Sequence, residues 1–403
     1  MSTKPPRALR RIFSLNDFER PARKKLPRPI FSYIYNGADE EVSLAHNRTA
    51  FNDYLLLPRM LEDVSARSQT IELFGQTYSS PFGISPVGLG ALYAYRGDIV
   101  LANAAARANI PAILSGASLI PMEEVARQAP NTWFQAYMPG DVERVDALLA
   151  RVKAAGFNTL VVTVDLPVSV NPENYIRNGF SSPLRPSVQL AWQGLSHPRW
   201  LLGTFGRTLL QHGMPHLENW RAERGAPILS ATIEKDLQAR DHFNWGHMRQ
   251  IRDRWQGTLI VKGLVRWQDA VRARDAGVDG IIVSNHGGRQ MDGSVSPLHV
   301  LPEIVKAVPD VVVMMDSGIR RGSDVIKALS LGARCVFAGR PFNYASSVAG
   351  GAGVDHAINI LQTELHRAMA LLGLNRLEEL DGTMVRHVDS LRPARSPSST
   401  LRQ

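Results

Sequence analysis

The chain has 403 residues, of which 46 are Lys or Arg and 37 are Asp or Glu, so its formal net charge is +9. With 44% hydrophobic and 21% charged residues, its composition is that of a globular protein, which excludes a fibrous class and argues against long disordered stretches. Its single cysteine, Cys335, excludes an internal disulfide and a zinc site made of several cysteines, so no metal is implied and a cytoplasmic location is expected.

Basic residues interrupt every apolar run in residues 1–29, so this segment does not predict a secretion signal. The chain contains no stretch of 18 apolar residues, and we therefore expect no membrane-spanning helix and, at most, peripheral membrane contact. The charge alone fits nucleic acid, anionic lipid or an anionic small substrate equally well. Because no nucleic-acid-binding motif accompanies it, a nucleic-acid partner is not expected.

Eight short β-branched or apolar runs recur along the chain, and each ends in polar residues. Most neighbouring runs are separated by a stretch with helical spacing, which is typical of parallel α/β folds whose strands are buried on both faces. Eight such units predict a (β/α)8 TIM barrel. A doubly wound sheet is the alternative, but no G-x-G-x-x-G fingerprint opens a first helix. The runs begin at residues 81, 110, 132, 159, 258, 279, 311 and 333.

The fourth and fifth runs begin at residues 159 and 258, much further apart than the others. This gap predicts one long insertion after the fourth strand, at about residues 167–257. We expect residues 1–391 to form a single barrel domain. Residues 392–403 are mainly Ser, Pro and Arg, have little to bury and are expected to be disordered.

The strongest local signal for chemistry is SNHGGRQMDG, which directly follows an apolar strand. Barrel enzymes carry their catalytic residues at the C-terminal ends of strands. Histidine is the common general base of enzymes, so His286 can take a proton from a substrate, while Arg289 can bind a carboxylate through two N–H groups. Asp165, at the end of another strand, can orient the imidazole and stabilise its protonated form.

The loops after the seventh and eighth strands carry a second signal, in the sequences DSGIRRG and AGRP. In barrels these loops commonly bind phosphate. The N–H groups of Gly318 and Gly339, with Arg320 and Arg340, would neutralise a phosphate monoester. Lys262 ends the fifth strand in a barrel mouth that should be largely dry, which suggests that it stabilises an anionic cofactor or intermediate.

Together these motifs resemble the FMN-dependent L-2-hydroxy-acid oxidases and dehydrogenases. That family includes glycolate and lactate oxidases, membrane-associated L-lactate dehydrogenase and (S)-mandelate dehydrogenase. The resemblance covers about residues 14–380. It is carried by KKLPRPIFSYIYNGADEE, ISPVGLG, WFQAY, SNHGGRQ and DSGIRRGSDVIKALSLGA.

The resemblance implies FMN as the cofactor and gives each site residue a role. In the substrate site, His286 is the implied catalytic base and Asp165 its partner. Arg289 is the implied carboxylate clamp, and Tyr33 and Tyr137 are hydroxyl donors. The implied cofactor residues are Pro86, Val87, Gly88, Ser115, Gln135, Thr163 and Lys262 around the flavin ring, with Lys262 at its N1–C2 edge, and Ser284, Asp316, Ser317, Gly318, Ile319, Arg320, Gly339 and Arg340 along the ribityl phosphate.

The implied reaction oxidises an L-2-hydroxy acid to a 2-oxo acid. His286 takes a proton, two electrons pass to N5 of FMN, and Lys262 stabilises the reduced cofactor. The proton comes either from Cα or from the hydroxyl group with hydride transfer, and both routes stay open. An alternative of another class is an FMN-binding barrel that has lost catalysis.

One position departs from the family pattern. In NPENYIRNGF, residues 171–180, Pro172 precedes Glu173 where the family usually has an arginine. That arginine is a second cationic group at the substrate carboxylate, so its loss leaves Arg289 and the tyrosines to bind the carboxylate alone. The side chains that would otherwise approach are Arg177, Asn171 and Asn174.

The substrate is therefore predicted to be atypical. Ala117 stands where several oxidases of the family carry an aromatic side chain, which also favours a roomier pocket. Together with Pro172 it predicts a substrate larger or less acidic than glycolate or lactate. The alternative is that the loop around Pro172 simply rearranges.

The insertion is basic and rich in aromatic and apolar residues. From Arg177 to Arg224 it contains six arginines and two glutamates, a net charge of +4. Such a stretch can lie on an anionic membrane surface. LSHPRWLLGTFGRTLLQHGMPHLENW, residues 195–220, resembles the membrane-binding insertion of the family's mandelate-oxidising members, and we expect peripheral membrane contact through residues 180–212. A lid over the active site or a subunit contact is the alternative.

Membrane binding bears on the electron acceptor. A peripheral enzyme on the cytoplasmic face of the inner membrane would pass electrons to quinone or another membrane acceptor. A soluble oxidase would instead use O2 and produce H2O2. The resemblance also implies a homo-oligomer, a tetramer.

Overall fold

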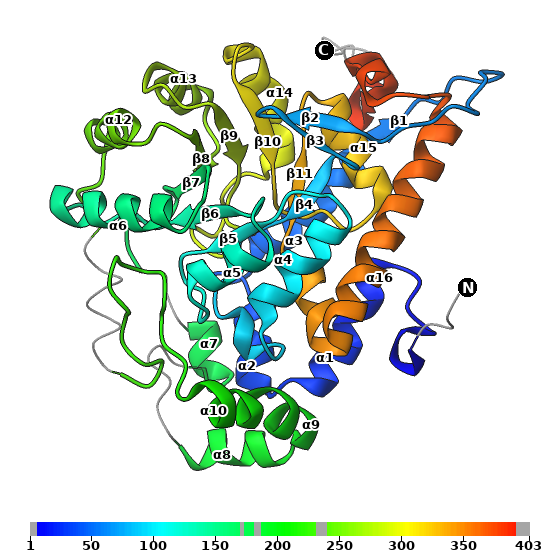
Figure 1. The fold of residues 1–403 in the computed structure, drawn as a ribbon. Helices are drawn as coiled ribbons and strands as arrows, with labels where there is room; N and C mark the ends of the chain where they lie inside the picture. Colours follow the sequence, from blue (N-terminus) through cyan, green and yellow to red (C-terminus); the bar gives the residue numbers. More distant parts are fainter. Residues whose placement is uncertain (1–5, 170–172, 181–186, 231–239, 392–403) are drawn as a thin grey trace, which may run out of the picture.

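Eight parallel strands form the centre of the computed structural model (Figure 1). They lie in the order β4-β11-β10-β9-β8-β7-β6-β5, and a parallel bridge between Ile84 and Ala112 joins the two ends into a nearly closed ring. The predicted TIM barrel is therefore confirmed. The structure describes residues 6–169, 173–180, 187–230 and 240–391. The strands are β4 (Phe82–Ile84), β5 (Ile113–Ser115), β6 (Trp133–Ala136), β7 (Thr159–Thr163), β8 (Thr258–Leu264), β9 (Gly280–Val283), β10 (Val312–Met315) and β11 (Val336–Ala338).

Each barrel strand coincides with one of the eight runs found in the sequence. Every residue of β7 and of β9 is buried, as expected for strands covered by the barrel core on one face and by helices on the other. The register places Thr163 of β7 opposite Lys262 of β8, and Ser115 of β5 opposite Gln135 of β6. Polar residues at the C-terminal ends of different strands therefore meet at one mouth of the barrel.

Helices alternate with the strands and cover the outside of the ring (Figure 1). In α6, Asp141 caps the first turn by accepting hydrogen bonds from two backbone N–H groups, and Val145, Leu149 and Val152 recur at helical spacing on the buried face. The helices that follow the strands are α4 (Gly97–Arg107), α5 (Met122–Gln128), α6 (Val142–Ala154), α12 (Trp245–Arg254), α13 (Trp267–Asp275), α14 (Pro297–Ala307), α15 (Gly322–Ser330) and α16 (Arg340–Leu372).

The N-terminal segment packs against the barrel. Helix α1 (Glu19–Lys25) lies against α16, whose path changes at Ala349 and Gly350, where the backbone leaves the helical conformation. Helix α2 (Arg28–Tyr35) reaches the barrel mouth, and α3 (Val42–Thr49) follows it. Two small antiparallel sheets lie outside the barrel, formed by β1 (Tyr54–Leu56) with β12 (Val385–His387) and by β2 (Ile71–Leu73) with β3 (Gln76–Tyr78).

The chain between β7 and β8 contains the insertion. Its last helix, α12, packs against α6, in the position of an ordinary crossover helix. Residues 187–212, which we call the α8–α10 cluster, form a separate group at the lower end of the view in Figure 1. The helical segments before α12 are α7 (Glu173–Arg177), α8 (Val188–Leu195), α9 (Pro198–Trp200), the π-helical turn Leu201–Gly206 and α10 (Arg207–His212).

Among the contacts that tie the insertion to the barrel, two are made by buried side chains. Within the α8–α10 cluster, Trp200 is buried and its Nε1 donates a hydrogen bond of 2.7 Å to the carbonyl of Leu92. Further along the chain, Asn219 accepts from the N–H of Met122 at 2.9 Å and donates to the carbonyl of Ile120 at 2.8 Å. The stretch around Asn219 therefore belongs structurally to the barrel, although it lies in the insertion.

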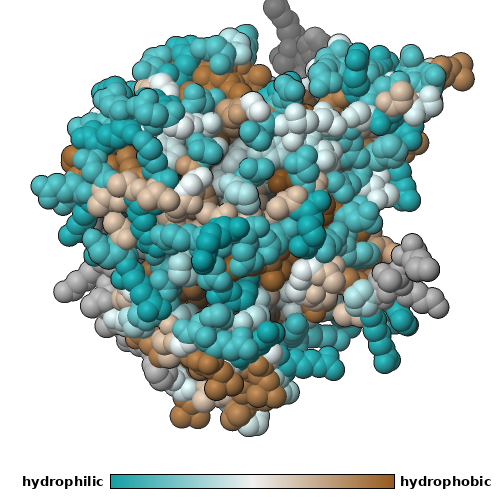
Figure 2. Space-filling view, in the orientation of Figure 1, coloured by the Kyte–Doolittle hydropathy of each residue, from teal (hydrophilic) through white to brown (hydrophobic). Residues whose placement is uncertain are grey.

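The α8–α10 cluster exposes large apolar side chains, and Figure 2 shows a brown area at the lower end of the molecule, where this cluster lies in Figure 1. Among the described residues, no helix combines the length and apolarity needed to cross a membrane. The tail 392–403, predicted to be disordered, lies outside the described residues. The exposed apolar side chains of the cluster are Val188, Trp192, Leu195, Leu202 and Leu210.

Candidate active site

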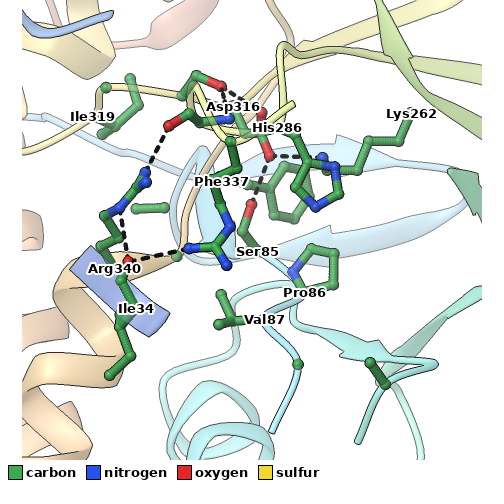
Figure 3. A pocket seen from close by; sticks show the side chains of 18 of the residues that line it. Ile34, Ser85, Pro86, Val87, Lys262, His286, Asp316, Ile319, Phe337 and Arg340 are labelled. Carbon is green, nitrogen blue, oxygen red and sulfur yellow. Dashed lines mark hydrogen bonds and ion pairs between the residues drawn. The ribbon is translucent and has the colours of Figure 1, made fainter. Parts of the chain in front are cut away.

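A pocket opens at the C-terminal ends of the barrel strands, where the sequence predicts the chemistry (Figure 3). Most of the predicted site residues line it, namely Tyr33, Pro86, Val87, Gly88, Tyr137, Lys262, His286, Arg289, Asp316, Ser317, Gly318, Ile319, Arg320, Gly339 and Arg340. Of the others, Asp165 lies against His286, and four are buried at or just beyond the ends of β5, β6, β7 and β9, namely Ser115, Gln135, Thr163 and Ser284. The fold thus brings the predicted residues together from eight strands and from α2.

His286 and Asp165 form a close pair at this pocket. Nδ1 of His286 lies 2.8 Å from Oδ1 of Asp165, and their side chains are 18% and 11% exposed. Burial opposes ionisation of Asp165, but the charges of His286 and Lys262 and the hydrogen bond from His286 outweigh it and lower the pKa of Asp165. The carboxylate therefore stays ionised and holds Nδ1, which leaves Nε2 to act on a substrate.

Backbone conformation contributes to this pair. The φ angle of His286 is 55°, in the left-handed region that few residues other than glycine adopt. Gly263 of β8 lies beside Asp165, and a Cβ atom there would be 2.6 Å from Cγ of Asp165. A side chain at this position would displace the carboxylate, so the pair depends on the glycine of the TLIVKG run.

Arg289 lies among aromatic rings at the pocket wall. Its guanidinium is 4.9 Å from the ring centre of Tyr33 and 5.6 Å from that of Tyr175, and it donates a 2.5 Å hydrogen bond to the carbonyl of Tyr33. Burial raises the pKa values of Tyr33 and Tyr137, so both hydroxyls stay protonated and able to donate near neutral pH. A fixed cation beside two O–H donors suits a carboxylate.

Cations gather at the other end of the pocket. Burial and the charges of Arg48 and Arg340 lower the pKa of Arg320 to about 10, and burial and the charge of Arg289 lower that of Arg340. Cations crowded in this way are stabilised by an anion that neutralises them. Helix α16 begins at Arg340, so its N-terminal N–H groups add to the same positive region. The region suits a phosphate group.

Lys262 is the buried cation at the base of the pocket. Its side chain is 4% exposed, donates to Oγ of Ser284 at 2.9 Å and lies 3.2 Å from Asp316. Ser85, which the sequence did not single out, donates to the same Asp316 oxygen at 2.9 Å (Figure 3). Its one signal in the sequence is its position at the end of β4, next to Pro86. Lys262 is therefore held as a fixed charge.

Unpaired polar atoms point to a planar heterocycle in this pocket. Nε2 of Gln135 and Oγ1 of Thr163 are buried and have no hydrogen-bond partner within the described part of the chain. Such atoms are normally paired. They lie on the adjacent strands β6 and β7, close to the lysine of β8, and together they match the N–H and carbonyl edge of a flavin ring. With the cationic region for its phosphate, the pocket fits FMN.

Two residues of the insertion, Arg240 and Trp220, also reach this site and were not predicted. The guanidinium of Arg240 lies 4.8 Å from the ring centre of Tyr137 and 4.8 Å from that of Trp220, and the two rings are 4.8 Å apart. Arg240 is only 7% exposed, and burial lowers its pKa. The charges of Arg240 and Arg289 both act on the Tyr137 hydroxyl. Nothing in the local sequence indicates this contact, because it depends on how the insertion folds back.

Arg177 and Asn174, expected as possible replacements for the arginine that Pro172 displaces, do not line the pocket. Arg177 is 66% exposed and pairs with Glu173 at 3.4 Å. Asn174 donates to the carbonyl of Asp39 at 2.7 Å, and neither it nor Arg177 borders the pocket formed by the described residues. Pro172 and Asn171 lie outside the described residues. Of the expected substitutes, Asn174 and Arg177 are thus occupied elsewhere.

Comparison with known families decides the identity of the chain. Residues 22–387 match the family described as FMN-dependent dehydrogenase. The chain belongs to this family. It is therefore an enzyme whose cofactor is FMN, as the sequence predicted.

Relatives of this FMN-dependent dehydrogenase cover nearly its whole length. It is 37% identical to (S)-mandelate dehydrogenase of Pseudomonas putida over 363 residues, which are 90% of this chain and 91% of that protein. It is 40% identical to L-lactate dehydrogenase of Caulobacter sp. (strain K31) over 384 residues, 94% and 99% of the two chains. A crystal structure described as the monotopic membrane protein (S)-mandelate dehydrogenase matches with a TM-score of 0.86 and 35% identity, covering 94% of this chain and all of that one.

Proposed function

We propose that this dehydrogenase oxidises an L-2-hydroxy acid to the corresponding 2-oxo acid. The observation that carries the proposal is the His286–Asp165 pair, with 2.8 Å between Nδ1 and Oδ1, whose histidine lines the same pocket as Arg289. A base and a carboxylate-binding cation are the two groups that oxidation of a hydroxy acid requires. The names of the relatives, mandelate and lactate dehydrogenase, support the same substrate class.

In the proposed reaction, Arg289 binds the substrate carboxylate, and the hydroxyls of Tyr33 and Tyr137 donate hydrogen bonds to the substrate. Nε2 of His286 takes a proton, and the ionised Asp165 stabilises the resulting imidazolium. FMN, when bound, supplies the acceptor for the two electrons that leave the substrate.

We assign the cofactor contacts from the donors that the pocket presents. Gln135, Thr163 and Lys262 hold the ring edge, and the fixed charge of Lys262 stabilises negative charge that develops beside it. Arg320 and Arg340, with the N-terminus of α16, hold the phosphate. The remaining predicted contacts are Pro86, Val87, Gly88, Ser115, Ser284, Asp316, Ser317, Gly318, Ile319 and Gly339, which surround the same pocket.

We also propose that the substrate carries a bulky side chain. Ala117 and Gly88 both line the pocket, so this part of its wall is made of two small residues. Small wall residues leave room that a lactate methyl group does not fill. The relatives acting on mandelate by name accept an aromatic substituent of this kind.

For the electron acceptor we propose quinone, reached from the cytoplasmic face of the inner membrane through the α8–α10 cluster. The exposed apolar side chains of the cluster and the arginines of the insertion support contact with an anionic bilayer. The structural relative described as a monotopic membrane protein supports it as well. We also propose that the protein forms a homo-oligomer, a tetramer.

The test is anaerobic reduction of the flavin in the holoenzyme by a panel of L-2-hydroxy acids from glycolate to mandelate, followed at the yellow absorbance band. We expect bleaching, fastest with the bulky substrates, and recovery of the colour on addition of quinone. If no hydroxy acid bleaches the flavin, the proposal fails and the chain is an FMN-binding protein. Recovery with O2 and release of H2O2, but not with quinone, would make it an oxidase.

A further inference from the structure

A large apolar cavity lies between the α8–α10 cluster and the barrel, apart from the active-site pocket. Its volume is about 450 Å³ and it is open to the outside. Helix α2 contributes Ile30, the turn after β4 contributes Leu92, and the insertion contributes Gly194, Trp200 and Phe205. Apart from Ser187, the described residues that line it are apolar.

The lining decides what kind of molecule this cavity can hold. A water molecule needs two to four polar partners, which these walls do not offer, and apolar cavities that stay dry bind hydrocarbon. A void also deprives its lining of contacts, so a cavity of this size favours an occupant. The occupant that matches the walls is a hydrocarbon chain rather than a polar metabolite.

Two segments connect this cavity with the cofactor pocket. In α2, Ile30 lines the cavity and Ile34 lines the cofactor pocket, so one helical turn, about 6 Å of rise, separates them. In the segment after β4, Gly88 lines the cofactor pocket and Leu92 lines the cavity. A molecule whose chain lies in the cavity is therefore about one helical turn from the flavin site.

The mouth of the cavity lies within the exposed apolar surface of the molecule. Leu195 lines the cavity and is itself 66% exposed, and Trp192 and Leu202 of the same cluster are 68% and 73% exposed. Figure 2 shows this apolar area at the lower end of the molecule, where α8 lies in Figure 1. A hydrophobic molecule can enter from a bilayer without crossing a polar rim.

We propose that this cavity binds the isoprenoid tail of a membrane quinone and so places the quinone ring at the flavin site. The inference rests on the proposed function, in which quinone is the acceptor. The reaction balances: the 2-hydroxy acid loses two electrons and two protons to become the 2-oxo acid, and the quinone gains two electrons and two protons to become the quinol. The tail takes no part in the chemistry and contributes binding free energy only.

The test fills the cavity with a side chain. In Gly194→Phe the new ring occupies the space of the tail, because Gly194 is buried in the cavity wall and its position has no close neighbour, with Leu201 Cδ1 at 3.8 Å. The matched control is Gly203→Phe, since Gly203 lies in the same insertion, is exposed, has open space around it and does not line the cavity. Both variants are compared with the wild-type holoenzyme.

Steady-state rates are measured with decylubiquinone, with tailless ubiquinone-0 and with phenazine methosulfate. Burial of one methylene group changes affinity about fourfold. We therefore expect Gly194→Phe to raise the KM for decylubiquinone about tenfold or more, without changing the rates with the other two acceptors. Gly203→Phe should change none of the three. An unchanged KM for decylubiquinone in Gly194→Phe would overturn the proposal.

Equilibrium binding of decylubiquinone to each holoenzyme, measured by calorimetry, separates this inference from the proposed function. Saturable binding to the wild type and to Gly203→Phe, but not to Gly194→Phe, supports the cavity as a binding site. This holds even if the wild type reduces only the dye, a result that would contradict quinone as the acceptor. Absence of saturable binding to the wild type overturns the cavity site, whichever acceptor proves active.

Discussion

At the scale of single residues, the site depends on pairs that come from distant parts of the chain. His286 and Asp165 are 121 positions apart and meet because β7 and β9 both flank β8 and end at the same mouth. The tetrapeptide HGGR and the motif TVD each mark the C-terminal end of a strand in the sequence. In a TIM barrel these ends lie at the same mouth, so the two motifs are expected to be close together. Residues of this kind can be predicted from sequence.

Replacing the base tests the proposed roles directly. We expect His286→Gln to retain FMN, because the side chain is not among the proposed contacts to the phosphate or the ring edge, and to lower kcat by several orders of magnitude. Flavin absorbance measures cofactor content, and single-turnover bleaching measures the chemical step. Near-wild-type bleaching in a variant that carries a full complement of FMN would remove His286 from the role of base.

Arg240 shows what local sequence cannot predict. Its contact with Tyr137 requires the insertion to fold back over the end of β6, and no periodicity or motif around residue 240 encodes that path. Ser85 was missed for a different reason, because a serine at a strand end is common and its bond to Asp316 appears only in three dimensions. The sequence shows that Pro172 differs from the family pattern, but the effect of this difference on substrate binding depends on side chains far from it in the sequence.

The cation over Tyr137 gives a second prediction at this scale. A guanidinium over a ring at a desolvated site contributes about 1–2 kcal/mol. We therefore expect Arg240→Leu to raise the KM for the hydroxy acid roughly five- to thirtyfold, with a smaller effect on kcat, because Tyr137 loses the group that holds it. Arg240→Lys, which keeps the charge, should recover part of the loss. Equal kinetics in the Leu variant and the wild type would contradict this role.

At the scale of elements, the loop after β4 rests on a buried acid. Asp98, near the start of α4, is 5% exposed, and a Cβ on Gly90 of that loop would lie 2.8 Å from its Oδ1. Burial raises the pKa of Asp98 to about 6. Since the ordinary pKa of an aspartic acid is 3.8, protonation of Asp98 favours the folded state, and this contribution is lost as pH rises through about 6.

Asp98→Asn should therefore stabilise the protein near neutral pH. The expected gain is up to about 3 kcal/mol at pH 7.5 and close to zero near pH 4, because the variant no longer has to bury a charge. Urea unfolding at pH 4.5 and pH 7.5 measures it. A difference between variant and wild type that does not grow with pH would show that Asp98 is not the titrating group.

The elements themselves were predictable to different degrees. All eight barrel strands follow from apolar runs that end in polar residues, because burial on both faces leaves a strong pattern. The helices of the α8–α10 cluster carry no such signal. Their exposed Trp192 and Leu210 blur the amphipathic pattern, and Trp200 is anchored by a backbone carbonyl of a distant segment.

At the scale of the whole molecule, the exposed apolar side chains of the α8–α10 cluster lie within a basic insertion. We expect the triple variant Trp192→Ser, Leu202→Ser and Leu210→Ser to lose binding to vesicles that contain anionic lipid, because it removes the apolar surface that would enter the bilayer. Activity with a soluble dye should be retained. Flotation of the holoenzyme with vesicles measures the binding.

A matched control is a triple variant at Leu61, Met291 and Leu371, which are equally exposed apolar residues outside the insertion. It should bind vesicles as the wild type does. Rising salt should weaken wild-type binding, since the arginines of the insertion contribute attraction to anionic lipid. Wild-type protein that never floats with such vesicles would contradict the membrane proposal.

The contacts of the insertion divide it into parts that differ in how freely they can be exchanged. Residues 187–212 contact the rest of the molecule through Trp200, Gln193 and the residues around Tyr95. Asn219 instead hydrogen-bonds to the segment after β5, and Arg240 lies over Tyr137. Transplanting the first part between relatives should change which surface and acceptor the enzyme uses while leaving its substrate the same. Transplanting the second should change the substrate, so the boundary for chimeras lies near Gly213.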